Sequence, residues 1–393
     1  MHNMKKPEKR EIEAEFKSLL ESYPVVVVTG PRQAGKTTLV RSVCKELPYF
    51  SLEEPDIRDS ALSDPRRFLN KSSSGIVLDE IQRAPELLSY IQGMVDAEKK
   101  PGRFILTGSQ QFEMTKSITQ SLAGRAAMLR LLPFTIAETK VFKKNMSADD
   151  YLVYGFYPAI YDQKLEPFRT YRNYFETYIQ RDLRDLAYIK DLRLFQKFVR
   201  LCAGRTGQIF NSNSLANEVG VSHNTIQSWL STLEASYIVF LLEPYYENVG
   251  KRLIKSPKLY FYDVGLASYL LGIQNRKHLE SHPLRGSLFE NMVVVELLKS
   301  RTNRGLDSGL FFYRDSHQQE VDIIFSSGNK LTPVEIKGTE TFNKDNLKGL
   351  KAFKKVFPKK ATRGYVVYEG KIALPAEGTD VLPYTSAAKI VDG

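Results

Sequence analysis

The most constraining feature of the sequence is a glycine-rich segment near its start, GPRQAGKT at residues 30–37. It fits the pattern GxxxxGK[ST], follows the β-branched run Val25–Thr29, and precedes a predicted helix over 38–43. In that context the glycines let backbone N–H groups curl around phosphate oxygens, and the helix N-terminus adds a partial positive charge. The segment therefore predicts a phosphate site built on a buried parallel strand.

Each residue of this segment is a candidate for nucleotide binding. Lys36 is expected to reach the β- and γ-phosphates, and Thr37 to bind Mg²⁺. The candidates are Gly30, Pro31, Arg32, Gln33, Ala34, Gly35, Lys36, Thr37, Thr38 and, further along the chain, Asp79.

A second apolar strand, predicted over 75–79, ends in the two acids Asp79 and Glu80. Carboxylates at the edge of a buried strand are costly unless a cation or water is near. Asp79 is the expected Mg²⁺ partner, and Glu80 the residue that polarises an attacking water. The alternative is a strand that ends in a solvated turn.

Two further candidates lie downstream. Ser109 follows a third predicted strand, 104–108, where a polar group could sense the γ-phosphate; a helix N-cap is the alternative. Arg125 follows Gly124, and a fixed cation with forked donors suits stabilisation of phosphoryl transfer. The alternative is an exposed helix arginine.

Composition excludes several classes of protein. The chain has 393 residues, 42% of them hydrophobic and 26% charged, which excludes full disorder and predicts two or three domains. No apolar run approaches the roughly 20 residues of a spanning helix, and 1–10 lacks a secretory pattern, so we expect a cytoplasmic chain with no membrane partner. Two cysteines exclude a disulfide scaffold. The net charge of +11 suggests a polyanionic partner.

The segments GPRQAGKTT, IVLDEIQ, LTGSQQ and SLAGR, in this order, resemble the AAA+ ATPases, in a prokaryotic branch with a C-terminal DUF4143 extension. The stretches 174–186 and 257–266 belong to the same resemblance. It implies an ATPase core that uses ATP with Mg²⁺ or Mn²⁺ and assembles into homo-oligomers, with a ring as one form. It also implies that Arg125 completes a neighbour's site, with Arg181 as an alternative sensor arginine.

The expected fold class is α/β with several domains. A P-loop AAA+ core is expected over 1–150, a helical lid over 151–207 and a winged-helix domain over 208–280. An α/β domain like a restriction endonuclease is expected over 283–393.

The winged-helix prediction comes from residues 214–230. Apolar residues line one face of each of two short helices, and Gly220 fits the turn between them. The side chains left on the outside, suited to a DNA major groove, are His223, Asn224, Gln227 and Ser228. Strands predicted over 237–242 and 258–262 would form a wing whose tip offers Lys251, Arg252 and Lys255 to phosphates. The alternative is a winged helix used only for packing.

The nuclease prediction comes from two strands, 320–325 and 333–337, on either side of a turn at 328–329. A two-residue hairpin loop makes paired numbers sum to 657, which puts Asp322 opposite Glu335 with Lys337 on the same face. Asp322 and Glu335 could hold a divalent cation. With Glu290 on the helix predicted over 287–300, this layout resembles the PD-(D/E)xK nucleases, although Val321 replaces the proline. The alternatives are exposed salt bridges or a catalytically silent nuclease fold.

Residues 336–371 contain ten Lys or Arg and three Asp or Glu. Four lysines there fall on one helical stripe: Lys344, Lys348, Lys351 and Lys355. Nucleic acid, DNA before RNA, is the expected partner. The chain is thus predicted to be an ATPase that acts on DNA, with metal-dependent cleavage as one possibility. The alternatives are a regulatory switch that cuts nothing and a protein-remodelling ATPase.

Overall fold

The computed structural model describes residues 8–108, 121–182, 189, 191–247, 256–315 and 317–392, without the side chains of 179–182 and 392. The chain divides into two compact units. The first comprises Met1–Phe134 with Ala235–Tyr237 and Thr302–Gly305, and the second comprises Thr135–Glu234, Ile238–Arg301 and Leu306–Gly393.

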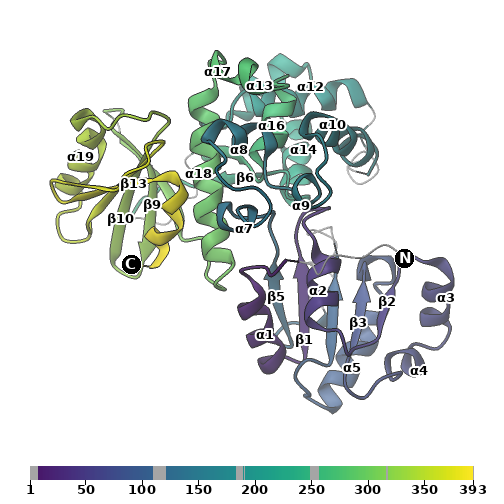
Figure 1. The fold of residues 1–393 in the computed structure, drawn as a ribbon. Helices are drawn as coiled ribbons and strands as arrows, with labels where there is room; N and C mark the ends of the chain where they lie inside the picture. Colours follow the sequence, from purple (N-terminus) through teal and green to yellow (C-terminus); the bar gives the residue numbers. More distant parts are fainter. Residues whose placement is uncertain are drawn as a thin grey trace. The chain divides into compact units, whose positions relative to one another are not determined.

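The first unit is built on a five-stranded parallel sheet of order β2-β3-β4-β1-β5 (Figure 1). Its strands are β1 (Val25–Thr29), β2 (Tyr49–Ser51), β3 (Ile76–Asp79), β4 (Phe104–Thr107) and β5 (Ala126–Arg130). Its described helices are α1 (Glu13–Ser22), α2 (Lys36–Val43), α3 (Pro55–Ser63), α4 (Pro65–Leu69), η1 (Ile81–Arg83) and α5 (Leu87–Ala97).

Both faces of this sheet are covered. Val26 and Val28 belong to one buried cluster with residues of α1 and α2, whereas Val25 and Val27 belong to another with residues of α5. A strand buried on both faces has no polar side to show, which explains the unbroken valine run. The three strands predicted from apolar runs are confirmed, and because β3 lies next to β4 and β4 next to β1, their carboxyl ends share one edge.

The second unit begins with helices, as the sequence predicted for 151–207. They are α7 (Ile136–Thr139), α8 (Ala148–Tyr154), α9 (Pro158–Asp162), α10 (Pro167–Tyr174), the π-helix η2 (Phe175–Asp182) and α12 (Leu192–Ala203). Two helices follow, α13 (Ser212–Val219) and α14 (His223–Ala235), and then the antiparallel strands β6 (Val239–Leu242) and β7 (Lys258–Phe261). After these strands come α16 (Val264–Leu270) and α17 (Arg276–Glu280).

The turn between α13 and α14 has the predicted chemistry. Gly220 ends α13 with φ +89°, a conformation that only glycine adopts without cost. Ser222 Oγ accepts the backbone N–H of Thr225 at 3.1 Å and so caps the start of α14.

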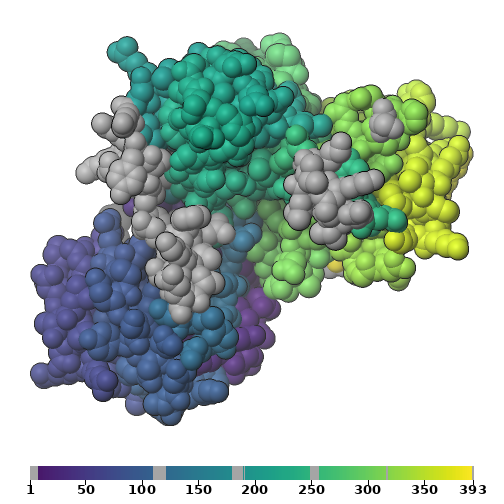
Figure 2. All heavy atoms as spheres, turned by 180° about the vertical axis from the view of Figure 1, so that it is seen from behind, coloured from purple at the N-terminus to yellow at the C-terminus, as the bar shows by residue number. Residues whose placement is uncertain are grey.

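The C-terminal part of this unit joins a long helix to a six-stranded sheet. Helix α18 (Arg285–Thr302) is buried along most of its length and lies between the other helices of the unit and the sheet (Figure 1). The sheet order is β12-β13-β11-β10-β9-β8. Its elements are β8 (Leu310–Arg314), β9 (Glu320–Ser327), β10 (Lys330–Lys337), η3 (Lys344–Leu347), α19 (Lys348–Val356), β11 (Gly364–Tyr368), β12 (Leu374–Ala376), β13 (Thr379–Pro383) and η4 (Tyr384–Asp392). Figure 2 shows the residues of this sheet in yellow-green to yellow, beside the green residues that precede the sheet in the chain.

The hairpin register is the predicted one. Pairs run from Lys330↔Ser327 to Val334↔Ile323, each summing to 657, with the turn at Gly328 in the left-handed region. In the described part of the chain, no helix has both the length and the apolar character needed to cross a bilayer.

Candidate nucleotide site and acidic centre

The phosphate loop connects the end of β1 to the start of α2. Gly30 has φ +143°, and a Cβ there would lie 2.0 Å from the Leu131 carbonyl oxygen, so only glycine fits. Gln33 and Gly35 have φ +63° and +92°, and successive turns of this kind leave backbone N–H groups to face an anion. The first turn of α2 adds N–H groups that have no intrahelical acceptor. The loop is therefore shaped to bind phosphate oxygens.

Lys36 lies within this loop and is 7% exposed. Its Nζ donates to the carbonyl oxygens of Gly30 at 2.9 Å and Pro31 at 2.8 Å. Burial lowers the pKa of Lys36 to about 8, although Glu80 and Asp79 act in the opposite direction. A bound phosphate group would favour the ammonium form by supplying negative charge.

Asp79 is 5% exposed and accepts hydrogen bonds from three hydroxyl groups. Thr37 Oγ1 donates to Asp79 Oδ2 at 3.0 Å, which brings the two predicted Mg²⁺ residues together. Tyr49 Oη donates to the same oxygen, and Thr107 Oγ1 donates to Oδ1. The carboxylate is thus held at the edge of the sheet, beside the loop.

Tyr49 and Thr107 were missed by the sequence reasoning. Tyr49 lies on β2, a three-residue strand with little signal of its own, and the guanidinium of Arg41 lies 3.9 Å from its ring centre. Thr107 precedes the predicted sensor position by two residues. Their strands flank β3: Thr107 follows Leu106, which pairs with Leu78, and Tyr49 lies two positions before Ser51, which pairs with Asp79.

Glu80 turns away from the strand immediately after Asp79. Its φ of +57° and ψ of +49° are left-handed, a conformation that costs a residue other than glycine about 1–2 kcal/mol. The side-chain amide of Gln82 donates to Glu80 Oε2. The predicted water-activating carboxylate is therefore partly exposed and already held by a neighbour.

Arg10 is a third residue that the sequence reasoning missed. It is 7% exposed, and its two terminal nitrogens donate to the carbonyl oxygens of Ala34 at 2.9 Å and Leu132 at 2.8 Å. The guanidinium also lies 4.8 Å from the ring centre of Phe134. Arg10 thus connects the phosphate loop to the segment that follows β5.

Arg125, the predicted residue of a neighbour's site, is paired within its own chain. Its Nε and Nη2 lie 2.6 Å and 3.0 Å from the two carboxylate oxygens of Asp96 on α5, which makes the ion pair bidentate. Ser109 and the side chain of Arg181, the other two candidates of this kind, lie outside the described residues.

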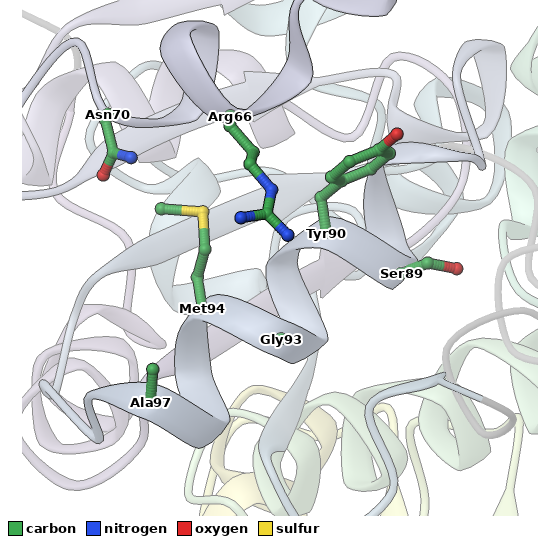
Figure 3. Close-up of a pocket in the computed structure, with 7 residues that line it drawn as sticks. All are labelled: Arg66, Asn70, Ser89, Tyr90, Gly93, Met94 and Ala97. Carbon is green, nitrogen blue, oxygen red and sulfur yellow. The ribbon is translucent and has the colours of Figure 1, made fainter.

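One pocket of the first unit lies away from the phosphate loop. It has a volume of about 420 Å³ and opens between α4 and α5 (Figure 3). Its lining residues are Arg66, Asn70, Ser89, Tyr90, Gly93, Met94 and Ala97. None of them was predicted, and none belongs to the nucleotide site.

The second candidate site lies at β9, β10 and α18. Continuing the observed register places Asp322 beside Glu335, and the backbone N–H of Ile336 donates to Asp322 Oδ2 at 2.7 Å. Lys337 Nζ donates to Glu335 Oε1 at 2.6 Å. Burial, and then repulsion from Asp322, raise the pKa of both Glu335 and Glu290. The four predicted residues are therefore brought together.

Lys258 of β7 lies against this centre and was not predicted to do so. Its Nζ lies 3.2 Å from Glu290 Oε1 and 2.6 Å from Glu320 Oε1. Tyr260 Oη donates to Glu290 Oε1 at 2.6 Å. Burial acts to lower the pKa of Lys258, but Glu290, Asp322 and Glu320 more than offset it and raise that pKa above its usual range.

Glu290, Asp322 and Glu335 do not form a three-carboxylate metal centre as they are arranged. Among the residues that the structure describes, no group of three or more His, Cys, Asp or Glu side chains is spaced to hold a metal ion. Glu290, expected to complete the set with Asp322 and Glu335, is instead engaged by Lys258 and Tyr260.

Family models match most of the chain. An AAA domain model matches residues 22–140, and the model of a domain of unknown function, DUF4143, matches 285–387. Another domain of unknown function, DUF8612, matches 145–277. The uncharacterized protein Rv2008c of Mycobacterium tuberculosis is 32% identical over 339 residues, which cover 85% of this chain and 75% of the relative.

The chain belongs to the AAA+ ATPases with a C-terminal DUF4143 domain.

This AAA+ ATPase also matches a relative in an archaeon. The uncharacterized protein MJ1544 of Methanocaldococcus jannaschii is 22% identical over 365 residues, 84% of this chain and 78% of the relative. Among solved structures, the Walker-type ATPase PABY2304 of Pyrococcus abyssi aligns with TM-score 0.44 and 15% identity, covering 67% of this chain and 95% of that one. A point variant of Thermotoga maritima RuvB aligns with TM-score 0.32 and 18% identity, covering 62% and 93%.

The predicted nucleic-acid residues of this ATPase are exposed where they are described. On α14 these are His223, Asn224, Gln227 and Ser228, and around α19 they are Lys344, Lys348, Lys351 and Lys355. Two of the lysines pair with acids at the surface: Lys348 with Asp345 at 3.1 Å and Lys351 with Glu377 at 2.7 Å. The three wing-tip residues, Lys251, Arg252 and Lys255, lie outside the described residues.

Proposed function

We propose that the first unit hydrolyses ATP with Mg²⁺ at the loop between β1 and α2. The observation that carries this proposal is the 3.0 Å hydrogen bond from Thr37 to Asp79, beside a buried Lys36. These three residues come from two elements and meet where the loop offers its N–H groups. A bound Mg²⁺ would neutralise charge on the β- and γ-phosphates.

Each side chain has a defined task in this proposal. Lys36 holds the β- and γ-phosphates, and Thr37 and Asp79 hold the metal. Glu80 orients and polarises the attacking water, and its partly exposed carboxylate exchanges the Gln82 amide for that water. Ser109 senses the γ-phosphate, and Arg125 of one subunit completes the site of another in a homo-oligomer.

Single substitutions test the ATPase proposal. Lys36→Ala is expected to abolish ATP binding, and Glu80→Gln to keep binding but reduce turnover by at least about 100-fold. Lys45→Ala removes an exposed lysine just beyond α2 and serves as the matched control, with turnover unchanged. ATP turnover that survives in Lys36→Ala would contradict the site assignment.

We further propose that the second unit binds DNA through the exposed face of α14 and the lysine stripe of η3 and α19. Support comes from the four exposed polar side chains of α14 and the four exposed lysines. Affinity for DNA is expected to fall as salt rises, with a log–log slope of about 0.9 per phosphate contact. Changing the four stripe lysines to Gln is expected to make that slope shallower. Binding that does not depend on salt would instead favour the protein-remodelling alternative.

We propose that the C-terminal centre takes part in DNA binding and does not cleave the DNA. Of the two hypotheses from the sequence, cleavage or a silent nuclease fold, the second is favoured by the contact of Lys258 with Glu290. Wild-type protein is expected to leave supercoiled and linear DNA intact with Mg²⁺ or Mn²⁺, with or without ATP. Nicking that disappears in Glu335→Ala would refute this part of the proposal.

A further inference from the structure

Lys258 is a buried cation at the acidic centre. Its side chain is 3% exposed and contacts two carboxylates, Glu290 at 3.2 Å and Glu320 at 2.6 Å. Tyr260, two positions along β7 and so on the same face of the strand, donates to the same Glu290 oxygen at 2.6 Å. One strand therefore supplies both a positive charge and a hydrogen-bond donor to the acid on α18.

The charges at this centre nearly require such a cation. Four carboxylates meet here, those of Glu290, Glu320, Asp322 and Glu335. Lys337 bonds Glu335, and Arg314 Nε lies 3.7 Å from Glu320 Oε2. A carboxylate withdrawn from water is strongly disfavoured unless a positive group or a donor pairs with it. For Glu290, the positive group is Lys258.

We propose that Lys258 is the resident cation of this centre and takes the electrostatic role that a divalent metal would have in a cleaving enzyme. The ion pairs then tie β7 to α18 and to β9, and the centre takes up no metal while Lys258 is present. This inference rests on the proposed non-cleaving function and gives it a physical cause.

A separate observation indicates where a cation would be held once Lys258 is removed. Glu335 is 9% exposed, and its Oε2 is buried without a hydrogen-bond partner. The backbone of α19 closes over this oxygen, since a Cβ on Gly349 would lie 3.2 Å from it. Removing the Lys258 ammonium would leave the Glu290 carboxylate without its paired cation. The variant centre would then attract a divalent ion.

The experiment is a Mn²⁺ titration without nucleotide, followed by the electron paramagnetic resonance signal of free Mn²⁺ and by Tm. Wild type is expected to show no site that depends on Asp322. Lys258→Met is expected to bind at least about tenfold more tightly, with saturating Mn²⁺ raising Tm by about 5 °C. The double variant Lys258→Met, Asp322→Asn is expected to lose both effects.

A matched control separates this effect from general damage to a core. Lys299 is another buried lysine, 1% exposed and 4.0 Å from Glu296 on α18. Lys299→Met is expected to lower Tm without any gain in Mn²⁺ binding. If Lys258→Met does not fold, Lys258→Gln removes the same charge and decides the question.

Two results would overturn the inference. One is an Asp322-dependent Mn²⁺ site in wild type, and the other is Mn²⁺ binding by Lys258→Met or Lys258→Gln no tighter than in wild type. Metal-dependent DNA cleavage by wild type would refute the proposed non-cleaving function. If the Lys258 variants bind Mn²⁺ no more tightly than wild type, only the proposed role of Lys258 is refuted, and the non-cleaving function is unaffected.

Discussion

Lys36 gives the nucleotide site a dependence on pH. Burial lowers its pKa to about 8 from 10.5, so much of the free protein holds it neutral above pH 8. Phosphate charge favours the ammonium, so binding above pH 8 must take up a proton. ATP affinity is therefore expected to be flat below pH 8 and to fall by up to about tenfold per pH unit above it. Calorimetry in buffers of different ionisation enthalpy measures the proton directly.

An arginine provides the control for this proton. Lys36→Arg keeps its charge throughout the same pH range. The ATP affinity that this variant retains is therefore expected not to fall above pH 8. An identical slope in both proteins would mean that another group takes up the proton.

Gly349 is a helix glycine that the acidic centre requires. Alanine in an open helix position is usually stabilising by up to about 1 kcal/mol. At Gly349, however, the new Cβ would lie 2.5 Å from the Glu320 carbonyl oxygen, so Gly349→Ala is expected to cost about 1–3 kcal/mol. Gly93 on α5 has no atom within 4 Å of such a Cβ, and Gly93→Ala is expected to be neutral or stabilising. Chemical denaturation compares the two, and equal effects would contradict the close packing at α19.

At the scale of elements, Arg10 joins the segment before α1 to the phosphate loop. Its fork spans the Ala34 and Leu132 carbonyl oxygens, a geometry that a single ammonium cannot reproduce. Arg10→Met is expected to lower stability by about 1–3 kcal/mol, because two buried acceptors lose their donors, and to weaken ATP binding. Arg10→Lys is expected to recover only part of each. Thermal melts with and without ATP measure both effects, and a Met variant that behaves like wild type would show that the loop holds its shape unaided.

Comparing the elements with the sequence shows which features of the fold and the sites can be predicted from sequence. Three features were predictable because each depends on residues close together in the chain: the phosphate loop, the acidic pair at the end of β3 and the β9–β10 register. Tyr49, Thr107 and Arg10 were not, since their partners are set by sheet order and by contacts across long stretches of chain. The sequence predicts that Lys258 lies in a wing strand, and nothing local in the sequence indicates that its side chain pairs with Glu290, 32 residues later.

At the scale of the whole molecule, the question is whether Arg125 acts on a neighbouring subunit. Within one chain it is held by Asp96, with side chains 31% and 45% exposed. Both partners remain accessible to water, so the pair can open at small cost, because exposed ion pairs contribute little. A role in a neighbour's site therefore requires only that assembly compete with Asp96.

Mixing two inactive variants distinguishes these roles. Glu80→Gln retains Arg125, and Arg125→Ala retains Glu80, so a neighbour-completed site in a mixed oligomer can contain both residues. Random assembly of equal amounts is expected to restore about one quarter of the wild-type sites. Asp96→Asn is the control: it frees Arg125 and is expected to keep turnover if Arg125 acts on a neighbour. If Arg125 only stabilises α5 of its own chain, Asp96→Asn is expected to lose as much ATP turnover as Arg125→Ala. The mixture would then show only the mean turnover of its two component variants.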